Sequence, residues 1–409
     1  MSKSAGLINE TKEYLAQNYD PLPVVLTQGE GVWVWDVEGN KYLDMLSSYS
    51  ANNFGHCHPS IVRALVSQAR RLDSVSRYFY TDVLAEFGRT ITEFCHMDRV
   101  LPANGGAEAV ETAIKLARKW GHERKAGVKP DSAEIIWCEN NFHGRTIAII
   151  SASTNPKNKK GFGPFTPGFR HVPFGDPDAL GRAINKNTVA FILEPIQGEG
   201  GIIVPEDGYL REVRKICDKF NVLMILDEIQ TGFGRTGRDF AYQYENIEPD
   251  VLILGKALGG GMLPVSAVLS RNEIMEVFTP GVHGSTFGGN PLACAVAVAS
   301  INLLIERNFD LRASSLGQYF MAELKKINSP LIREVRGKGL LIGLELVKEN
   351  EIGRRFCEAM LKLGILCSDT KDNVIRFAPP LVIEKKEINW AVEKIRLVLR
   401  HLMDPSHNS

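Results

Sequence analysis

The chain has 409 residues, and its 48 basic and 48 acidic side chains leave no formal net charge at pH 7. This balance provides no basic surface for a phosphate backbone, so we expect no nucleic-acid partner. With 44% hydrophobic residues and 37 glycines, the composition is typical of a soluble α/β protein and excludes a disordered or collagen-like chain. The length allows about two or three domains.

Neither a membrane-spanning segment nor a targeting leader is predicted. The densest apolar stretch, residues 292–305, is interrupted by Ser300 and Asn302. It falls short of the roughly 18 to 20 apolar residues that cross a bilayer. Residues 1–17 have no apolar core and include two glutamates, which a secretory or organellar leader would avoid. We therefore expect a cytoplasmic protein, or else the mature form of a processed chain, without a membrane partner.

The cysteines and histidines give no sign of a metal or disulfide framework. Seven cysteines are scattered through apolar contexts, which favours reduced thiols in the core. The cluster His56-Cys57-His58 has metal-binding residue types, but it lacks a third ligand nearby and is followed by Pro59. A loop before a helix is the simpler interpretation, so no metal is expected.

The first predicted element is a small hairpin within residues 31–40, where an alternating pattern ends in Glu-Gly-Asn. The clearest helix candidate is residues 108–120, which place apolar side chains such as Val110 and Ile114 at helical spacing. Further along, short β-branched apolar runs predict strands that are buried on both faces. These runs are residues 134–138, 189–193, 222–226 and 251–254. Their alternation with helical segments predicts a mainly parallel sheet with crossover helices.

The pattern changes after about Asp310, where long amphipathic segments alternate with residues 337–345 and 373–377. This change predicts a smaller α+β domain at the C-terminal end. We therefore divide the chain into three parts: an N-terminal segment (1–46) that packs with the small domain, a large domain (47–309) and the small domain itself (310–409).

Two of the predicted strands are followed by charged residues. Asp227 comes directly after the run 222–226, and Lys256 follows Gly255 after the run 251–254. Ligands of open α/β sheets bind at the carboxyl ends of the strands. A carboxylate there can pair with a protonated ring nitrogen, and a lysine in an apolar pocket can form a Schiff base. Taken alone, either residue could also be a structural charge.

Two motifs surround these residues. Asp227-Glu-Ile-Gln-Thr-Gly-Phe-Gly-Arg-Thr-Gly237 and Leu254-Gly-Lys-Ala-Leu-Gly-Gly-Gly261 together resemble the signature of the class III pyridoxal-phosphate-dependent aminotransferases. Similar segments run along nearly the whole chain: residues 18–23, 47–50, 55–59, 76–80, 194–199, 283–291 and 375–380. Within the class, the set is most similar to the ornithine aminotransferases. The resemblance implies the type I, aspartate-aminotransferase-like fold of these transferases, with a large domain and a small α+β domain.

The resemblance also implies pyridoxal 5'-phosphate as cofactor and assigns residues around its ring. Lys256 would bind the cofactor and carry the proton, because its amine is tethered beside the reacting carbon. Asp227 would keep the ring nitrogen protonated, and Gln230 would hydrogen-bond the ring 3-oxygen. Phe142 would stack on the ring, with His143 beside it in the cofactor site.

The phosphate of the cofactor would bind at the start of the predicted helix. Backbone N–H groups of Gly106 and Ala107 are suited to this role, because a helix N-terminus binds anions. Relatives usually have Ser or Thr at the position of Gly105, so one hydroxyl contact is expected to be missing. Ser285 and Thr286 resemble the pair that reaches a phosphate across a dimer interface. The resemblance thus implies a homodimer with active sites at the interface.

The charges of the substrate pocket suit a diamine donor and a dicarboxylate acceptor. Arg376 would bind the α-carboxylate of 2-oxoglutarate or glutamate, and Arg145 the distal carboxylate. When ornithine is bound, Glu199 would neutralise Arg376. In the family, Tyr19 and Tyr49 help to hold the amino-acid end of ornithine. The implied reaction converts L-ornithine and 2-oxoglutarate to glutamate 5-semialdehyde and glutamate by a ping-pong mechanism.

Two positions give opposite indications of which amino donor the enzyme uses. His143 stands where acetylornithine aminotransferases carry His and eukaryotic ornithine aminotransferases commonly carry Trp. Tyr49 stands where many relatives have a smaller residue, which favours ornithine. The alternative is therefore an aminotransferase of the same family that acts on acetylornithine or on another ω-amino acid, such as 4-aminobutyrate.

Two other classes of function fit less well. Residues 232–237 match the G-x-G-x-x-G pattern of nicotinamide oxidoreductases, but residues 227–231 separate them from the predicted strand and no helical pattern follows. A non-enzymatic scaffold that only binds the cofactor predicts the loss of Lys256, Asp227 or Arg376. All three residues are present.

Overall fold

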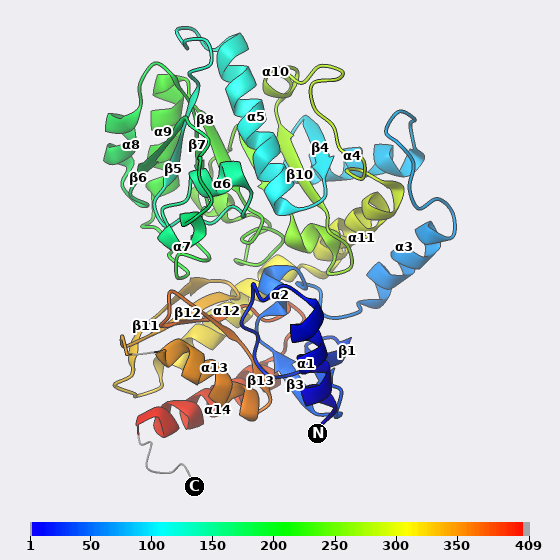
Figure 1. Ribbon diagram of the computed structural model, residues 1–409, viewed down its shortest axis with the longest axis vertical. Coiled ribbons are helices and arrows are strands. Elements are labelled where there is room, and N and C mark those ends of the chain that lie inside the picture. Colours follow the sequence, from blue (N-terminus) through cyan, green and yellow to red (C-terminus); the bar gives the residue numbers. More distant parts are fainter. Residues whose placement is uncertain (1, 350, 404–409) are drawn as a thin grey trace.

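The computed structural model describes residues 2–349 and 351–403. Figure 1 shows a large sheet with helices packed around it in the upper part of the view and two smaller sheets with their helices below. The first and the last of the described helices, Lys3–Tyr14 and Lys385–Met403, both lie in the lower part. The predicted division of the chain at residues 46 and 309 stays a prediction.

The large sheet has seven strands, and six of them run parallel to one another, as the sequence predicts. The exception is β10, which is antiparallel to both of its neighbours. In spatial order the strands are β4 (Arg99–Ala103), β10 (Ser266–Ser270), β9 (Val251–Leu254), β8 (Leu223–Asp227), β7 (Thr188–Leu193), β5 (Glu134–Cys138) and β6 (Phe169–Val172).

The central strands are buried on both faces because consecutive side chains point to opposite sides of the sheet. Ile225 and Ile253 join the cluster beneath α5, whereas Leu226 and Leu252 join the cluster on the other face. The helices of this part are α3 (Pro59–Ala69), α4 (Asp82–Cys95), α5 (Gly106–Arg124), α6 (Ile147–Ser151), α7 (Pro156–Lys159), α8 (Pro177–Ala183), α9 (Tyr209–Phe220), α10 (Asn272–Met275) and α11 (Pro291–Arg307), with the short 3-10 turns η1 (Ala241–Glu245) and η2 (Lys256–Gly259).

The lower part contains elements from both ends of the chain. Its antiparallel sheet consists of β11 (Ile332–Lys338), β12 (Leu341–Leu346), β15 (Val374–Phe377) and β14 (Ser368–Thr370). The helices beside it are α12 (Phe309–Lys325), α13 (Ile352–Lys362) and α14 (Lys385–Met403). The N-terminal segment adds α1 (Lys3–Tyr14), β1 (Leu26–Glu30), β2 (Trp33–Asp36), β3 (Lys41–Asp44) and α2 (Ser47–Ser50).

The predicted hairpin is present, since β2 and β3 pair antiparallel, but its bounds were wrong: residues 31–40 contain only the first strand and the turn, and the second strand is Lys41–Asp44. On its other edge, β3 pairs in parallel with β13 (Ile365–Leu366). A strand from the C-terminal region therefore completes the N-terminal sheet.

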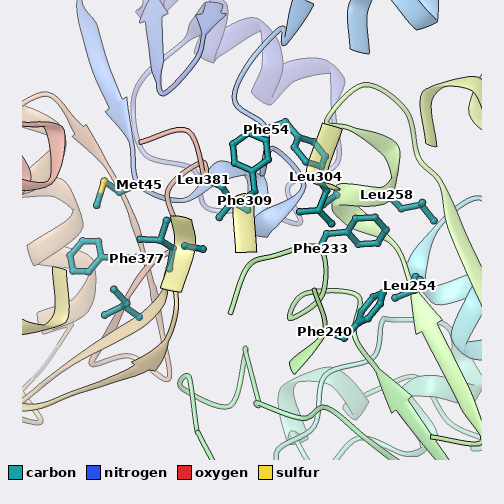
Figure 2. Packing of buried hydrophobic residues seen from close by; sticks show 14 of the residues in the cluster. Met45, Phe54, Phe233, Phe240, Leu254, Leu258, Leu304, Phe309, Phe377 and Leu381 are labelled. Carbon is teal, nitrogen blue, oxygen red and sulfur yellow. The ribbon is translucent and has the colours of Figure 1, made fainter. Parts of the chain in front are cut away.

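One hydrophobic cluster joins the two parts of the molecule. Figure 2 shows it extending from Leu254 and Leu258 past Phe233 and Leu304 towards Met45. In the middle, the rings of Phe54 and Phe309 lie 5.8 Å apart. Because the cluster is continuous, side chains from both parts are held in fixed positions around the region between them.

All seven cysteines are free thiols, and six of them are buried. His56 Nε2 lies 2.8 Å from an oxygen of Asp44, and His58 accepts a hydrogen bond from Ser60 N at the start of α3. Residues 2–349 and 351–403 contain no group of three or more His, Cys, Asp or Glu side chains arranged to hold a metal ion.

Within the same described ranges, no single helix is long and apolar enough to cross a membrane. Only α11 and α12 together meet the test of length and composition, and the pair is bent by 62°.

Candidate active site

A cavity of about 190 Å³ lies at the carboxyl ends of the central strands of the large sheet. This is the edge at which open α/β sheets bind ligands. The cavity brings together many of the residues that the sequence singled out: Gly106, Ala107, Phe142, His143, Glu199, Asp227, Gln230 and Lys256. Gly144, Glu194, Ile196, Ile229 and Thr231 complete its lining.

Asp227 is the last residue of β8 and is buried at the floor of the cavity. Its Oδ2 lies 2.6 Å from Nδ1 of His143, and its Oδ1 accepts a hydrogen bond from Ile229 N. Burial lowers the pKa of His143, but the hydrogen bond to Asp227 and the negative charge of that carboxylate outweigh burial, so the pKa is raised. The Nε2 atom of His143 is buried without a hydrogen-bond partner among the described residues.

Lys256 follows β9 by two residues and begins the turn η2 with a φ of 43°. Burial of its amine lowers the pKa of Lys256 below the ordinary value. The opposing charge of Asp227 raises the pKa and the positive charge of Arg376 lowers it, and the net effect is a decrease. A lysine with a lowered pKa spends more time as a neutral amine, which is the form that attacks carbonyls and accepts protons.

The start of α5 also lines the cavity. The first hydrogen bond of this helix joins Ala109 N to Gly105 O, so the N–H groups of Gly106 and Ala107 have no acceptor within the helix. Gly105 is the N-cap and supplies no side-chain cap. These free donors and the helix dipole suit a phosphate group.

The donor set of the cavity fits pyridoxal 5'-phosphate on these observations. The unsatisfied N–H groups of α5 match its phosphate, and the carboxylate of Asp227 matches a protonated ring nitrogen. The amine of Lys256 matches its aldehyde, and the lining includes the aromatic side chain of Phe142.

An ion pair marks the side of the cavity towards the small sheet. Arg376 lies on β15 and is only 1% exposed, and its Nη1 pairs with Glu199. The guanidinium carbon of Arg376 lies 4.6 Å from the centre of the Tyr49 ring. The structure thus joins three of the predicted substrate residues in one contact group.

Six predicted residues lie outside the cavity lining: Tyr49 and Arg376, which belong to the contact group beside it, and four others. Tyr19 is 79% exposed, and both Ser285 and Thr286 are exposed as well. Arg145 is exposed and donates a hydrogen bond to Asn158, with its guanidinium 5.7 Å from the centre of the Phe142 ring. Their roles in the site stay predictions.

Glu194 is a site residue to which the sequence analysis gave no role. It follows β7 directly, and its carboxylate accepts hydrogen bonds from Phe142 N at 3.0 Å and Gly198 N at 3.1 Å. Burial raises the pKa of Glu194 to about 7. The rule that identified Asp227, a charge directly after a buried apolar run, would have identified Glu194 too.

The fold and the cavity define a pyridoxal-phosphate-dependent aminotransferase of fold type I, as predicted. The chain belongs to the family described as "Aminotransferase class-III", whose sequence model matches residues 14–399. The match covers nearly the whole chain, so both parts of the molecule belong to the family architecture.

Individual relatives agree with this assignment. The ornithine aminotransferase of Brevibacillus brevis is 53% identical over 399 residues, which cover 98% of this chain and 99% of the relative. Ornithine aminotransferase 2 of Staphylococcus saprophyticus is 54% identical over 97% of this chain and 100% of its own. The crystal structure of ornithine aminotransferase from Toxoplasma gondii superposes with a TM-score of 0.96 at 43% identity, covering 98% of this chain and 96% of that chain. Acetylornithine aminotransferase from Elizabethkingia anophelis gives a TM-score of 0.89 at 46% identity, covering 98% and 100%.

Proposed function

We propose that this protein transfers the δ-amino group of L-ornithine to 2-oxoglutarate, producing glutamate 5-semialdehyde and glutamate in a ping-pong reaction. The observation that carries the proposal is the contact group of Arg376, Glu199 and Tyr49 beside the cavity that holds Lys256. The names of the relatives at 53% and 54% identity support the same donor.

Bound pyridoxal phosphate supplies an electron sink for the electrons released at the carbon that bears the amine. Lys256 Nζ takes the proton from that carbon and returns it, and its lowered pKa favours the neutral base. The negative charge of Asp227 would keep the ring nitrogen protonated, with His143 holding the carboxylate in place. Gln230 would hydrogen-bond the ring 3-oxygen, and Phe142 would cover the ring face.

The ion pair explains how one pocket accepts two different substrates. With ornithine bound, Glu199 keeps Arg376 neutralised, so the guanidinium neither repels the diamine nor captures its carboxylate. With 2-oxoglutarate bound, Arg376 turns from Glu199 to the α-carboxylate, while Arg145 binds the distal one. Tyr19 and Tyr49 hold the amino-acid end of ornithine.

The phosphate end is completed by a second copy of the chain. Gly106 and Ala107 donate backbone N–H groups to the phosphate. Ser285 and Thr286 of the second copy add hydroxyl donors, which is consistent with their exposure in the single chain. The protein therefore acts as a cytoplasmic homodimer in arginine metabolism or proline biosynthesis.

Donor comparison tests the proposal. Purified protein with 2-oxoglutarate receives L-ornithine, N-acetylornithine or 4-aminobutyrate, and glutamate is assayed beside an o-aminobenzaldehyde test for the semialdehyde. We expect glutamate from all productive donors and the coloured product from ornithine, with the highest kcat/KM for ornithine. A higher kcat/KM for acetylornithine would overturn the assignment of donor, and loss of glutamate formation with every donor would overturn the enzymatic role.

A further inference from the structure

Residues Ser47 to Ser50 form a turn with an unusual backbone. Their φ angles are 46°, 49°, 57° and 75°, so four consecutive residues with side chains lie in the left-handed region. Side chains crowd the backbone there, and single residues rather than runs normally adopt it. Strained backbone of this kind persists where the surrounding structure holds it, and it clusters at functional sites.

Two hydrogen-bonding groups clamp the start of this turn. Asp44 Oδ1 accepts hydrogen bonds from Leu46 N and Ser47 N, both at 2.8 Å. Ser47 Oγ donates to Ala378 O at 2.6 Å. Ala378 directly follows β15, the strand that carries Arg376. The turn is therefore tied to the strand of the substrate-binding arginine.

Arg235 joins this clamp from the large domain. It lies within the Gly232–Gly237 motif and is completely buried. Its Nη2 donates to Ser47 Oγ at 3.1 Å and to Asn53 Oδ1. Its Nη1 donates to Leu340 O at 3.0 Å and to Pro379 O at 2.7 Å. One rigid guanidinium thus binds four residues from three segments of the chain: 47–53, Leu340 and Pro379.

The turn that these contacts hold carries one side chain that touches Arg376. Tyr49 is the third residue of the turn, and its ring lies against the guanidinium of Arg376. Ser48, beside it, is exposed and makes no side-chain hydrogen bond among the described residues. The side chain of Ser48 therefore makes no hydrogen bond that would compensate for the strained backbone. The visible consequence of the turn is the placement of Tyr49 against Arg376.

We propose that Arg235 is a positioning residue which, through the left-handed turn Ser47–Ser50, fixes Tyr49 over Arg376 and so sets the selectivity for the amino donor. This inference rests on the proposed function, because Tyr49 is expected to contact the amino-acid end of the donor. It gives the Gly232–Gly237 motif a role in coupling the domains.

Ser48→Gly tests the turn directly. Glycine adopts positive φ without strain, so the variant should fold with an unchanged or higher Tm. Because the turn is then free to move, the KM for ornithine should rise about tenfold, while the KM for 2-oxoglutarate changes less than twofold. Asp131→Gly is the matched control, since Asp131 is exposed, has a φ of 54° and lies outside the cavity lining. An unchanged KM for ornithine in Ser48→Gly would overturn the proposal.

A double-mutant cycle separates positioning from general loosening of the structure. If the turn acts through Tyr49, Ser48→Gly should change the KM for ornithine less than twofold when Tyr49 is already alanine. Equal effects in both backgrounds would contradict the proposal that the turn acts through Tyr49.

Arg235→Lys removes the planar guanidinium that binds several partners at once, and it should narrow the ratio of kcat/KM between ornithine and acetylornithine. A ratio equal to that of the wild type in folded Arg235→Lys would remove Arg235 from the proposal.

The outcomes also separate this inference from the proposed function. If the unaltered enzyme prefers another donor, the proposed function fails. The same variants measured with that donor then still decide whether the turn positions Tyr49.

Discussion

The imidazole of His143 and the carboxylate of Asp227 form a buried pair, with 2.6 Å between Nδ1 and Oδ2. Asp227 Oδ1 also accepts a hydrogen bond from Ile229 N. The orientation of the carboxylate is therefore set by the imidazole of His143 and one backbone N–H group. The side chain that we propose to face the ring nitrogen of the cofactor thus depends on His143 for its direction.

Replacing His143 by phenylalanine should weaken cofactor binding. The variant keeps an aromatic ring but removes the donor from a buried carboxylate, and a hydrogen bond to a charged group contributes about 1.5 to 3 kcal/mol. We expect the Kd for pyridoxal phosphate to rise by about tenfold to a hundredfold. Fluorescence titration of the cofactor-free protein measures this Kd. The Kd of His143→Gln, which keeps a hydrogen-bond donor, should lie between those of the wild type and of His143→Phe. Equal Kd values for all three proteins would refute the role of His143.

Lys256→Ala should remove both covalent attachment and turnover. Borohydride reduction followed by peptide mass analysis should show the cofactor mass on the Lys256 peptide of the wild type and on no peptide of the variant. The rate should fall by at least about a thousandfold, since a tethered general base is lost. Cofactor mass on a different lysine would show that the assignment is wrong.

Glu199→Gln should affect the two half-reactions differently. Arg376 is nearly fully buried, and loss of the carboxylate leaves its charge without its anionic partner. The free guanidinium then repels the diamine and captures carboxylates. We expect kcat/KM for ornithine to fall by about tenfold or more, while that for glutamate stays within a few fold. Single-turnover measurements with each donor test this, and parallel losses would contradict the neutralising role.

Gly105→Ser should strengthen binding of the phosphate. The Cβ position of Gly105 has open space, and its φ of −86° and ψ of 154° suit an N-cap serine. The added hydroxyl should lower the Kd for pyridoxal phosphate about fivefold, which corresponds to about 1 kcal/mol. Gly181→Ser is the control, because that position is also open but lies in α8. Weaker binding in Gly105→Ser would show that the hydroxyl does not reach the phosphate.

The stability of the cofactor-free protein should depend on pH through Glu194. Burial raises the pKa of its carboxyl from the ordinary 4.5 to about 7. Between these pH values the folded state holds a proton that the unfolded state has released, so the free energy of unfolding falls as the pH rises, by about 3 kcal/mol from this group. Urea denaturation at pH 5 and pH 8 should show a smaller fall for Glu194→Gln than for the wild type. Equal falls would exclude this linkage.

The parts of the fold that the sequence predicted are those with a strong local signal. The apolar runs of β5, β7, β8 and β9 were recognisable because they are buried on both faces. Strands β4 and β10 were not predicted. β4 is an edge strand that contains Pro102, and β10 begins and ends with serine, so neither has a continuous apolar run.

The candidate site also has residues that the sequence predicted and features that it did not. Asp227 and Lys256 follow strand ends and belong to recognisable motifs, and the structure places both in one cavity. The left-handed turn at Tyr49 left no signal, because no glycine marks it and the hydrogen bond that Arg235 donates to Ser47 comes from 188 residues away in the sequence. Contacts between residues so distant in sequence cannot be read from local patterns.

The pairing of β3 with β13 sets an order of events during synthesis. Leu43 and Asp44 lie beside Ile365 and Leu366, so the N-terminal sheet lacks its last strand until residue 366 of 409 has left the ribosome. The strands of the large sheet are all made earlier and can assemble first. The turn that carries Tyr49 begins three residues after the end of β3, and its Ser47 binds Ala378. The region around Tyr49 therefore cannot reach its final arrangement until residue 378 has been synthesised, long after the strands of the large sheet.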